Sequence, residues 1–186
     1  MRLPPARIPL YLRPLAWKQK RQHGRVSEPT LLWAWRPRAM TAFLRMFGVL
    51  RAKRSPLSPR LQAMVSLRVS ERTGCGFCID LNASRLAAAG GDAAAIAQTL
   101  HDGSRAAFPE RERVALAYAE AMTATPPAVD DALFERVRAQ FTPEEVVELT
   151  AVIAFQNMSA RFNAALGAQP MGYCVLPSAD APRRRA

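Results

Sequence analysis

The chain has 186 residues, of which 49% are hydrophobic and 22% charged, and this composition excludes a protein that is disordered throughout. No apolar run approaches the roughly 18 to 20 residues that a membrane-spanning helix needs, so a membrane span is excluded as well. The net charge of +11 belongs to the two ends: residues 1–54 hold 13 of the 26 Lys and Arg residues and one acid, whereas residues 55–182 hold more acids than bases.

Residues 1–27 are predicted to form a basic, poorly packed arm. They contain four prolines and a cationic run from Lys18 to Arg25. Proline removes backbone hydrogen bonds, and like charges repel one another. We expect this arm to precede a helical domain over residues 28–174, which is followed by a C-terminal tail over residues 175–186.

From Thr30 onward the apolar residues recur at helical spacings, and no convincing run alternates with the period of a strand. Pro37 splits the first segment into a short turn and a helix. Ser58-Pro59 and the capping box Thr142–Glu145 are helix starts, and Gly167 is a natural stop. We therefore expect an all-α bundle of six to eight helices. The expected helices lie at about 38–53, 59–74, 75–89, 92–100 and 109–125, then from 130, and finally over 142–166.

The motif Cys75-Gly76-Phe77-Cys78 is the one feature of the sequence with chemical content. Two thiols three positions apart on a helical turn lie close enough to form a disulfide. If the motif sits at a helix N-terminus, unpaired backbone N–H groups and the helix dipole stabilise a thiolate. Two small buried cysteines that match the motif by chance are the simpler alternative, and redox chemistry is the interpretation we favour.

Three other uses of a paired-cysteine motif find less support. Zinc normally needs a second pair of ligands, and the chain offers only Cys174, His23 and His101, without ligand-like spacing. Covalent haem needs a histidine directly after the second cysteine, where this chain has Ile79. A thioredoxin fold needs strands around the motif, which here lies between predicted helices. We expect no cofactor and no metal.

Two adjacent stretches, Leu57–Ser70 and Thr73–Asn82, resemble the carboxymuconolactone decarboxylase / AhpD-like alkylhydroperoxidase superfamily. Glu144–Thr150 and Ala160–Gly167 resemble the closing helix of that family, so the resemblance covers roughly residues 30–170. It implies an AhpD-like helical bundle that assembles as a dimer, trimer or hexamer. It also implies peroxide reduction through a dithiol–disulfide cycle, with a hydroperoxide or disulfide substrate and a thiol reductant protein as partners.

The chain departs from the family pattern at two positions. The redox members carry a histidine four residues after the second cysteine and a glutamate about twelve residues before the first. This sequence has Asn82 at the first position and Ala63, beside Gln62, at the second. By this resemblance, both parts of the family's proton relay are missing.

The resemblance also implies which thiol reacts. Position 82 lies one helical turn beyond Cys78 and shares its face, so the family's base serves the second cysteine. Cys78 is the implied reactive thiol, Cys75 its resolving partner, and Asn82 a supporting residue that can donate a hydrogen bond to a thiolate but cannot accept a proton. Loss of general acid–base catalysis lowers the rate of a proton-transfer step by about 10²–10⁴-fold, so we expect a slow or altered enzyme.

Three further polar residues have simpler structural explanations. His101 follows an alanine-rich helix and is expected to satisfy its last carbonyls. Glu71, four residues before Cys75, is expected to be a solvated charge, and Cys174 an inert tail thiol.

Three functions stay open at this point. The one we favour is a thiol-dependent peroxidase or thiol–disulfide oxidoreductase that cycles Cys75 and Cys78. The second is a carboxymuconolactone-decarboxylase-like enzyme, and the third is a non-catalytic oligomeric relative with a degenerate site. No recognisable nucleic-acid-binding module surrounds the tryptophans of the basic region, so we expect no nucleic-acid partner.

Cysteine usage indicates a reducing compartment. The sequence has three cysteines, two of them in one tight motif, unlike the even, dispersed set of a disulfide-stapled secreted domain. The N-terminus is rich in arginine but lacks the apolar stretch of roughly 7 to 15 residues that secretory signals contain. We therefore expect a cytoplasmic protein.

Overall fold

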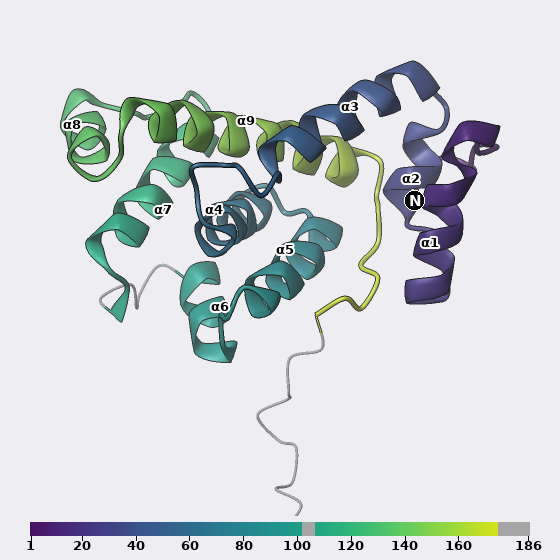
Figure 1. Cartoon of the computed structure of the whole chain (residues 1–186), viewed down its shortest axis with the longest axis horizontal. Helices are drawn as coiled ribbons and strands as arrows, with labels where there is room; N and C mark the ends of the chain where they lie inside the picture. Colours follow the sequence, from purple (N-terminus) through teal and green to yellow (C-terminus); the bar gives the residue numbers. More distant parts are fainter. Residues whose placement is uncertain (102–106, 175–186) are drawn as a thin grey trace, which may run out of the picture.

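The computed structural model describes residues 1–101 and 107–174, and all regular structure in these two stretches is helical, which confirms the all-α prediction (Figure 1). None of the helices in these stretches is long and apolar enough to cross a membrane. The tail predicted over 175–186 lies outside the described residues. The elements are η1 (Leu10–Leu12), α1 (Arg13–His23), α2 (Glu28–Trp33), α3 (Pro37–Leu50), α4 (Pro59–Arg72), α5 (Gly76–Ala88), α6 (Ala93–Leu100), α7 (Glu110–Thr123), α8 (Asp131–Gln140) and α9 (Pro143–Ala165).

Helix starts lie where capping side chains predict them. The Ser58 hydroxyl accepts a hydrogen bond from a backbone N–H in the first turn of α4. Asp92 and Asp130 cap α6 and α8 in the same way. Thr142 and Glu145 form the expected capping box at the start of α9. Each of these contacts spans three residues, so the local sequence is sufficient to specify it.

The described residues hold nine α-helices, more than the six to eight predicted. The additional helices are α1 and α2, in the region interpreted as an arm and a turn. Pro14 and Pro29 lie in the first turns of these helices, where proline removes no intrahelical hydrogen bond. Gly24 ends α1 with a φ of 75°, and its N–H donates to the carbonyl of Lys20.

Residues 1–27 contain helical structure and contact the rest of the chain at a few points, while most of their side chains are exposed. The backbone N–H of Arg2 donates to the Leu166 carbonyl at 2.8 Å. Leu12 and Ala16 are buried, whereas the basic side chains of α1 stay exposed. Figure 1 shows α1 and α2 beside the C-terminal end of α9. The like charges of α1 therefore do not prevent helix formation, because they point to solvent.

Helix α4 is the centre of the bundle. All ten residues from Leu61 to Ser70 are buried, and the helix packs against α5, α6, α7 and α9. Figure 1 shows α4 end-on among its neighbours. Its buried charge, Arg68, forms ion pairs with Glu71 and Glu120. α4 is thus the core against which α5 packs.

Candidate active site

The two cysteines of the motif form a disulfide at the N-terminus of α5. Gly74 has a φ of 67°, which favours glycine, and it turns the chain out of α4. Cys75 is the N-cap residue of α5, and its sulfur accepts a hydrogen bond from the backbone N–H of Cys78 at 3.2 Å. The Cα atoms lie 5.2 Å apart. The expected closeness of the pair and its place at a helix start are therefore both present.

The two cysteines differ in whether they line a cavity. Both cysteines are almost fully buried, with 1% of Cys75 and 2% of Cys78 exposed. Cys78 lines a cavity of about 350 Å³, whereas Cys75 is not among the residues of its wall. A small molecule in this cavity can therefore meet Cys78 and not Cys75.

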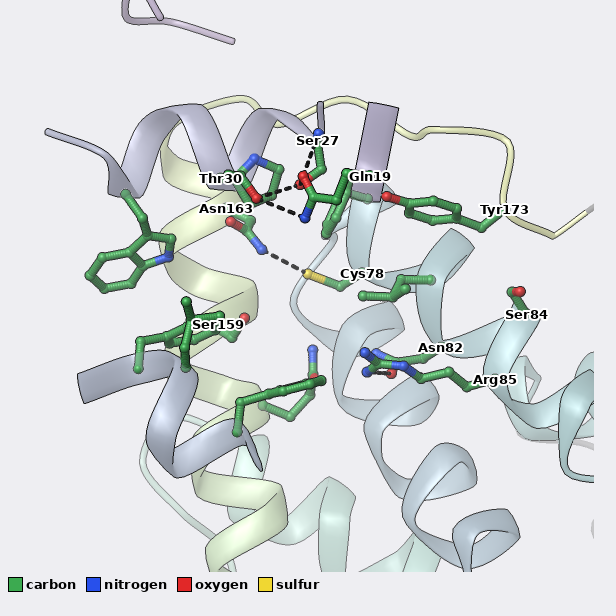
Figure 2. Close-up of a pocket in the computed structure, with 18 of the residues that line it drawn as sticks. Gln19, Ser27, Thr30, Cys78, Asn82, Ser84, Arg85, Ser159, Asn163 and Tyr173 are labelled. Carbon is green, nitrogen blue, oxygen red and sulfur yellow. Dashed lines mark hydrogen bonds between the residues drawn. The ribbon is translucent and has the colours of Figure 1, made fainter. Parts of the chain in front are cut away.

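The cavity lies where the N-terminal helices meet the bundle. Its wall is built by α1, α2, α3, α5, α9 and the C-terminal segment. One side is aromatic, with Phe43 stacked between Trp33 and Phe155 at centroid distances of 5.1 and 4.9 Å. A second side is polar: Gln19 Nε2 donates to Thr30 Oγ1 at 3.0 Å. Figure 2 shows this polar group on one side of Cys78. The cavity suits a molecule with an apolar body and a polar group.

Asn163 of α9 donates a hydrogen bond from Nδ2 to the Cys78 sulfur at 3.4 Å (Figure 2). The residue is only 3% exposed. Its Oδ1 is buried and has no hydrogen-bond partner among the described residues. Our sequence analysis missed Asn163, although it lies in the segment quoted for the family resemblance. The only available signal was a polar residue within a largely apolar helix segment.

Asn82, predicted to support the thiolate, is buried one turn beyond Cys78. Its Nδ2 donates to Ser70 Oγ at 3.1 Å, and its Oδ1 accepts from Arg85 Nη1 at 3.3 Å. In this disulfide form the amide hydrogen bond to Cys78 therefore comes from Asn163. Asn82 lines the same cavity, and its role in catalysis stays a prediction.

Sequence comparison places the chain among known proteins. Residues 37–121 match the carboxymuconolactone decarboxylase family. Over 178 residues the chain is 40% identical to the uncharacterized protein YnjA of Escherichia coli K12, a match that covers 95% of this chain and 98% of YnjA. The chain belongs to the carboxymuconolactone decarboxylase family. The resemblance seen in the sequence is thereby confirmed.

Solved structures share this fold. The AhpD core structure of an uncharacterized peroxidase-related protein from Ralstonia eutropha JMP134 has a TM-score of 0.80 at 24% identity, and the match covers 93% of this chain and 96% of that one. The apo structure of the debrominase Bmp8 has a TM-score of 0.76 at 21% identity and covers 88% of each chain. At these identities the likeness establishes the common fold and not a common reaction.

Of the two relay positions of this carboxymuconolactone decarboxylase family member, the glutamate position lies outside the cavity, whereas Asn82 at the histidine position lines it. Ala63 and Gln62 are buried in α4, and Gln62 Nε2 donates to Ser55 Oγ at 2.8 Å. Glu71, expected to be solvated, pairs with Arg68 at 3.0 Å. No aspartate or glutamate of the described residues lines the cavity. A carboxylate base at Cys78 is therefore absent from this part of the chain.

The cavity does contain an imidazole, from a residue to which the sequence assigned no role. His23 ends α1, lines the cavity, and packs edge-on against Tyr173 at 4.6 Å between ring centroids. His101 is exposed at the end of α6 and does not line the cavity. Over the described residues, no three His, Cys, Asp or Glu side chains gather as a metal site would require.

The remaining polar groups near the site are perturbed by burial. Burial lowers the pKa of Arg85 to about 9, and the nearby charge of Arg51 adds to this effect. Burial and the charge of Asp80 raise the pKa of Tyr173 and of the Cys174 thiol. Cys174 lies outside the cavity wall. A raised pKa disfavours its thiolate, in agreement with the inert thiol expected there.

Asn163→Ala is expected to slow alkylation of the reduced Cys78 thiol by iodoacetamide at pH 7 by about tenfold, because a hydrogen bond to a charged group contributes about 1.5–3 kcal/mol. The measurement is the alkylation rate in a Cys174→Ser background, with Cys78 followed by peptide mass spectrometry. Asn157→Ala is the matched control, because Asn157 lies on the same helix and donates to Thr123 outside the cavity. Equal rates for both variants would contradict a role for Asn163.

Proposed function

We propose that this protein reduces a small hydroperoxide through a dithiol–disulfide cycle of Cys75 and Cys78. One observation carries the proposal: the two sulfurs form a disulfide at a helix N-terminus, and Cys78 alone of the pair lines a cavity. Membership of a family whose structural relatives include a peroxidase-related protein supports it.

The proposed cycle begins with both cysteines reduced. The Cys78 thiolate attacks the terminal oxygen of the hydroperoxide, the O–O bond breaks, and the alkoxide leaves and takes up a proton as the alcohol. Cys78 is then a sulfenic acid. The Cys75 thiol attacks this sulfur, the disulfide forms, and water leaves. An external dithiol returns the two electrons and is itself oxidised to a disulfide.

The surroundings of each sulfur match the role assigned to it. Cys78 lies in the first turn of α5, where the helix dipole favours an anion, and it accepts a hydrogen bond from Asn163. During re-reduction the dithiol attacks Cys78, and Cys75 leaves as a thiolate. That thiolate accepts the backbone N–H of Cys78, as an N-cap group does.

Burial favours a small substrate over the disulfide of a partner protein. A protein disulfide must reach the attacking sulfur directly, yet only 2% of Cys78 is exposed. The cavity of about 350 Å³ instead falls within the range of small-molecule sites, which is about 300–1,000 Å³. We therefore assign the thiol–disulfide oxidoreductase function second place.

The first test is a thiol count without added reductant. The reduced chain has three thiols, and one equivalent of cumene hydroperoxide is expected to leave one, as titrated with dithionitrobenzoate. A Cys174→Ser variant should go from two thiols to none, with the Cys75–Cys78 disulfide identified by peptide mass spectrometry. Unchanged thiol counts after several equivalents would overturn the proposal.

Parallel assays distinguish the rival functions. Lactone turnover that persists in a Cys75→Ser/Cys78→Ser double variant would favour decarboxylase-like chemistry. Bromide release from 2,3,4-tribromopyrrole, the ligand of a Bmp8 variant in its solved complex, would indicate dehalogenation instead. Salt-sensitive binding to a polyanion, without any turnover, would favour the non-catalytic relative.

A further inference from the structure

Arg85 is a cation in the cavity of Cys78 that has no carboxylate partner among residues 1–101 and 107–174. Its guanidinium contacts Asn82 Oδ1 at 3.3 Å and lies 4.9 Å from the centre of the Phe47 ring. No carboxylate of the described residues forms an ion pair with it, and none lines the cavity. By contrast, the buried Arg68 of α4 is paired with two glutamates. Arg85 therefore stands out as a charge that the fold leaves uncompensated.

A second cation, Arg51, lies near Arg85 but is not among the residues of the cavity wall. Arg51 is 5.9 Å from the Phe47 ring, and it donates to Ser66 Oγ at 2.8 Å. Burial lowers its pKa to about 10, and its charge lowers the pKa of Arg85. No carboxylate that the structure describes pairs with either cation, so their partial desolvation costs free energy that a bound anion would recover.

The helix geometry brings the cation and the sulfur onto one wall. Arg85 follows Cys78 by seven residues, which is two turns of α5 and the same face. Its side chain reaches back towards the N-terminus as far as Asn82, one turn from Cys78. Figure 2 shows Arg85 and Asn82 on the side of Cys78 opposite the polar group of Gln19, Ser27 and Thr30. An anion on Arg85 therefore sits about one helical turn, about 5.4 Å along the axis, from the sulfur.

We infer that the cavity binds an organic carboxylate, with the carboxylate on Arg85 and the apolar body against Phe43, Phe47 and Phe155. The substrate class is then a hydroperoxide that also carries a carboxylate. This assignment of substrate rests on the proposed function, whereas the carboxylate site itself does not. A planar guanidinium suits the carboxylate because it can donate two parallel hydrogen bonds.

The site is tested first by binding to the disulfide form. The probe is 4-isopropylbenzoate and its uncharged counterpart is 4-isopropylbenzamide, both measured by calorimetry. We expect the benzoate to bind about 10- to 100-fold more tightly than the benzamide. This ratio corresponds to the free energy of a hydrogen bond to a charged group. Arg85→Met should abolish this preference and Arg85→Lys should keep part of it. Arg45→Met, which removes an exposed charge of α3 outside the cavity, should leave it unchanged.

Equal affinities for the two probes, or no binding of either, would overturn the carboxylate site. A preference that survives Arg85→Met would overturn it too. Circular dichroism of the folded Arg85→Met variant shows that any loss is local, and the partial effect of Arg85→Lys provides a second readout of the charge.

Turnover then tests the substrate class. Cumene hydroperoxide and its 4-carboxylate are compared in the presence of dithiothreitol, and kcat/KM is expected to be about 10- to 100-fold higher for the carboxylate. Equal values would overturn the substrate class while the peroxidase function stands. Benzoate binding through Arg85 with turnover of neither peroxide would support the carboxylate site and overturn the proposed function.

Discussion

Cys78→Ser is expected to lower the rate of hydroperoxide consumption with dithiothreitol by at least about 10³-fold, because a serine hydroxyl is not ionised at neutral pH and is a far weaker nucleophile. Cys78 is the cysteine of the pair that lines the cavity, so no other thiol of the motif can substitute for it. The measurement is loss of cumene hydroperoxide, followed with a ferrous–dye assay.

Cys75→Ser separates the two proposed steps. Its Cys78 thiolate should still react once with hydroperoxide, but the sulfenic acid then has no resolving partner and persists. Trapping with dimedone and mass spectrometry should detect the adduct in Cys75→Ser and not in Cys78→Ser. Cys174→Ser is the control for both, since Cys174 lies outside the cavity. Adduct on Cys75 in the Cys78→Ser variant would reverse the assigned roles.

Glu120→Ala is expected to destabilise the fold by about 3–5 kcal/mol, because it removes one of the two carboxylates that compensate a buried charge. Arg68 is only 2% exposed and forms ion pairs with Glu120 and Glu71. The contact to Glu71 persists in the variant, which places the loss at the lower end of that range. Urea unfolding followed by circular dichroism measures it.

The matched control for this prediction is Glu135→Ala. Glu135 pairs with Arg138 at 2.8 Å, and both side chains are more than 60% exposed. An exposed pair contributes about 0–1 kcal/mol, so this variant should unfold close to the wild type. A similar loss of unfolding free energy in both variants would show that the burial of Arg68 does not determine the size of the effect.

Much of the helical framework could be predicted because helix ends depend on local contacts. Ser58, Asp92 and Thr142 each cap a helix through an N–H three residues away. The sequence did not predict a helix within residues 1–27, whose prolines and charges suggested an arm. Pro14 fits into the first turn of α1, where it removes no intrahelical hydrogen bond, and composition does not reveal this position.

The candidate site could be predicted in part. The closeness of Cys75 and Cys78 follows from their spacing, and their place at a helix start follows from Gly74. Asn82 was placed correctly one turn from Cys78, but its amide contacts Ser70 and not the sulfur. Its partner Ser70 lies on α4, and no pattern within α5 indicates which groups the neighbouring helix presents.

The sequence by itself determined the helical class, the capped helix boundaries and the paired thiols, because each depends on atoms within one or two turns of chain. Only the tertiary structure decided that Cys78 faces a cavity, that Asn163 donates to its sulfur across 85 residues, and that no carboxylate of the described part of the chain lies beside Arg85 there. Those relations join separate helices, and how the helices pack is set by the burial of their apolar faces over the whole bundle.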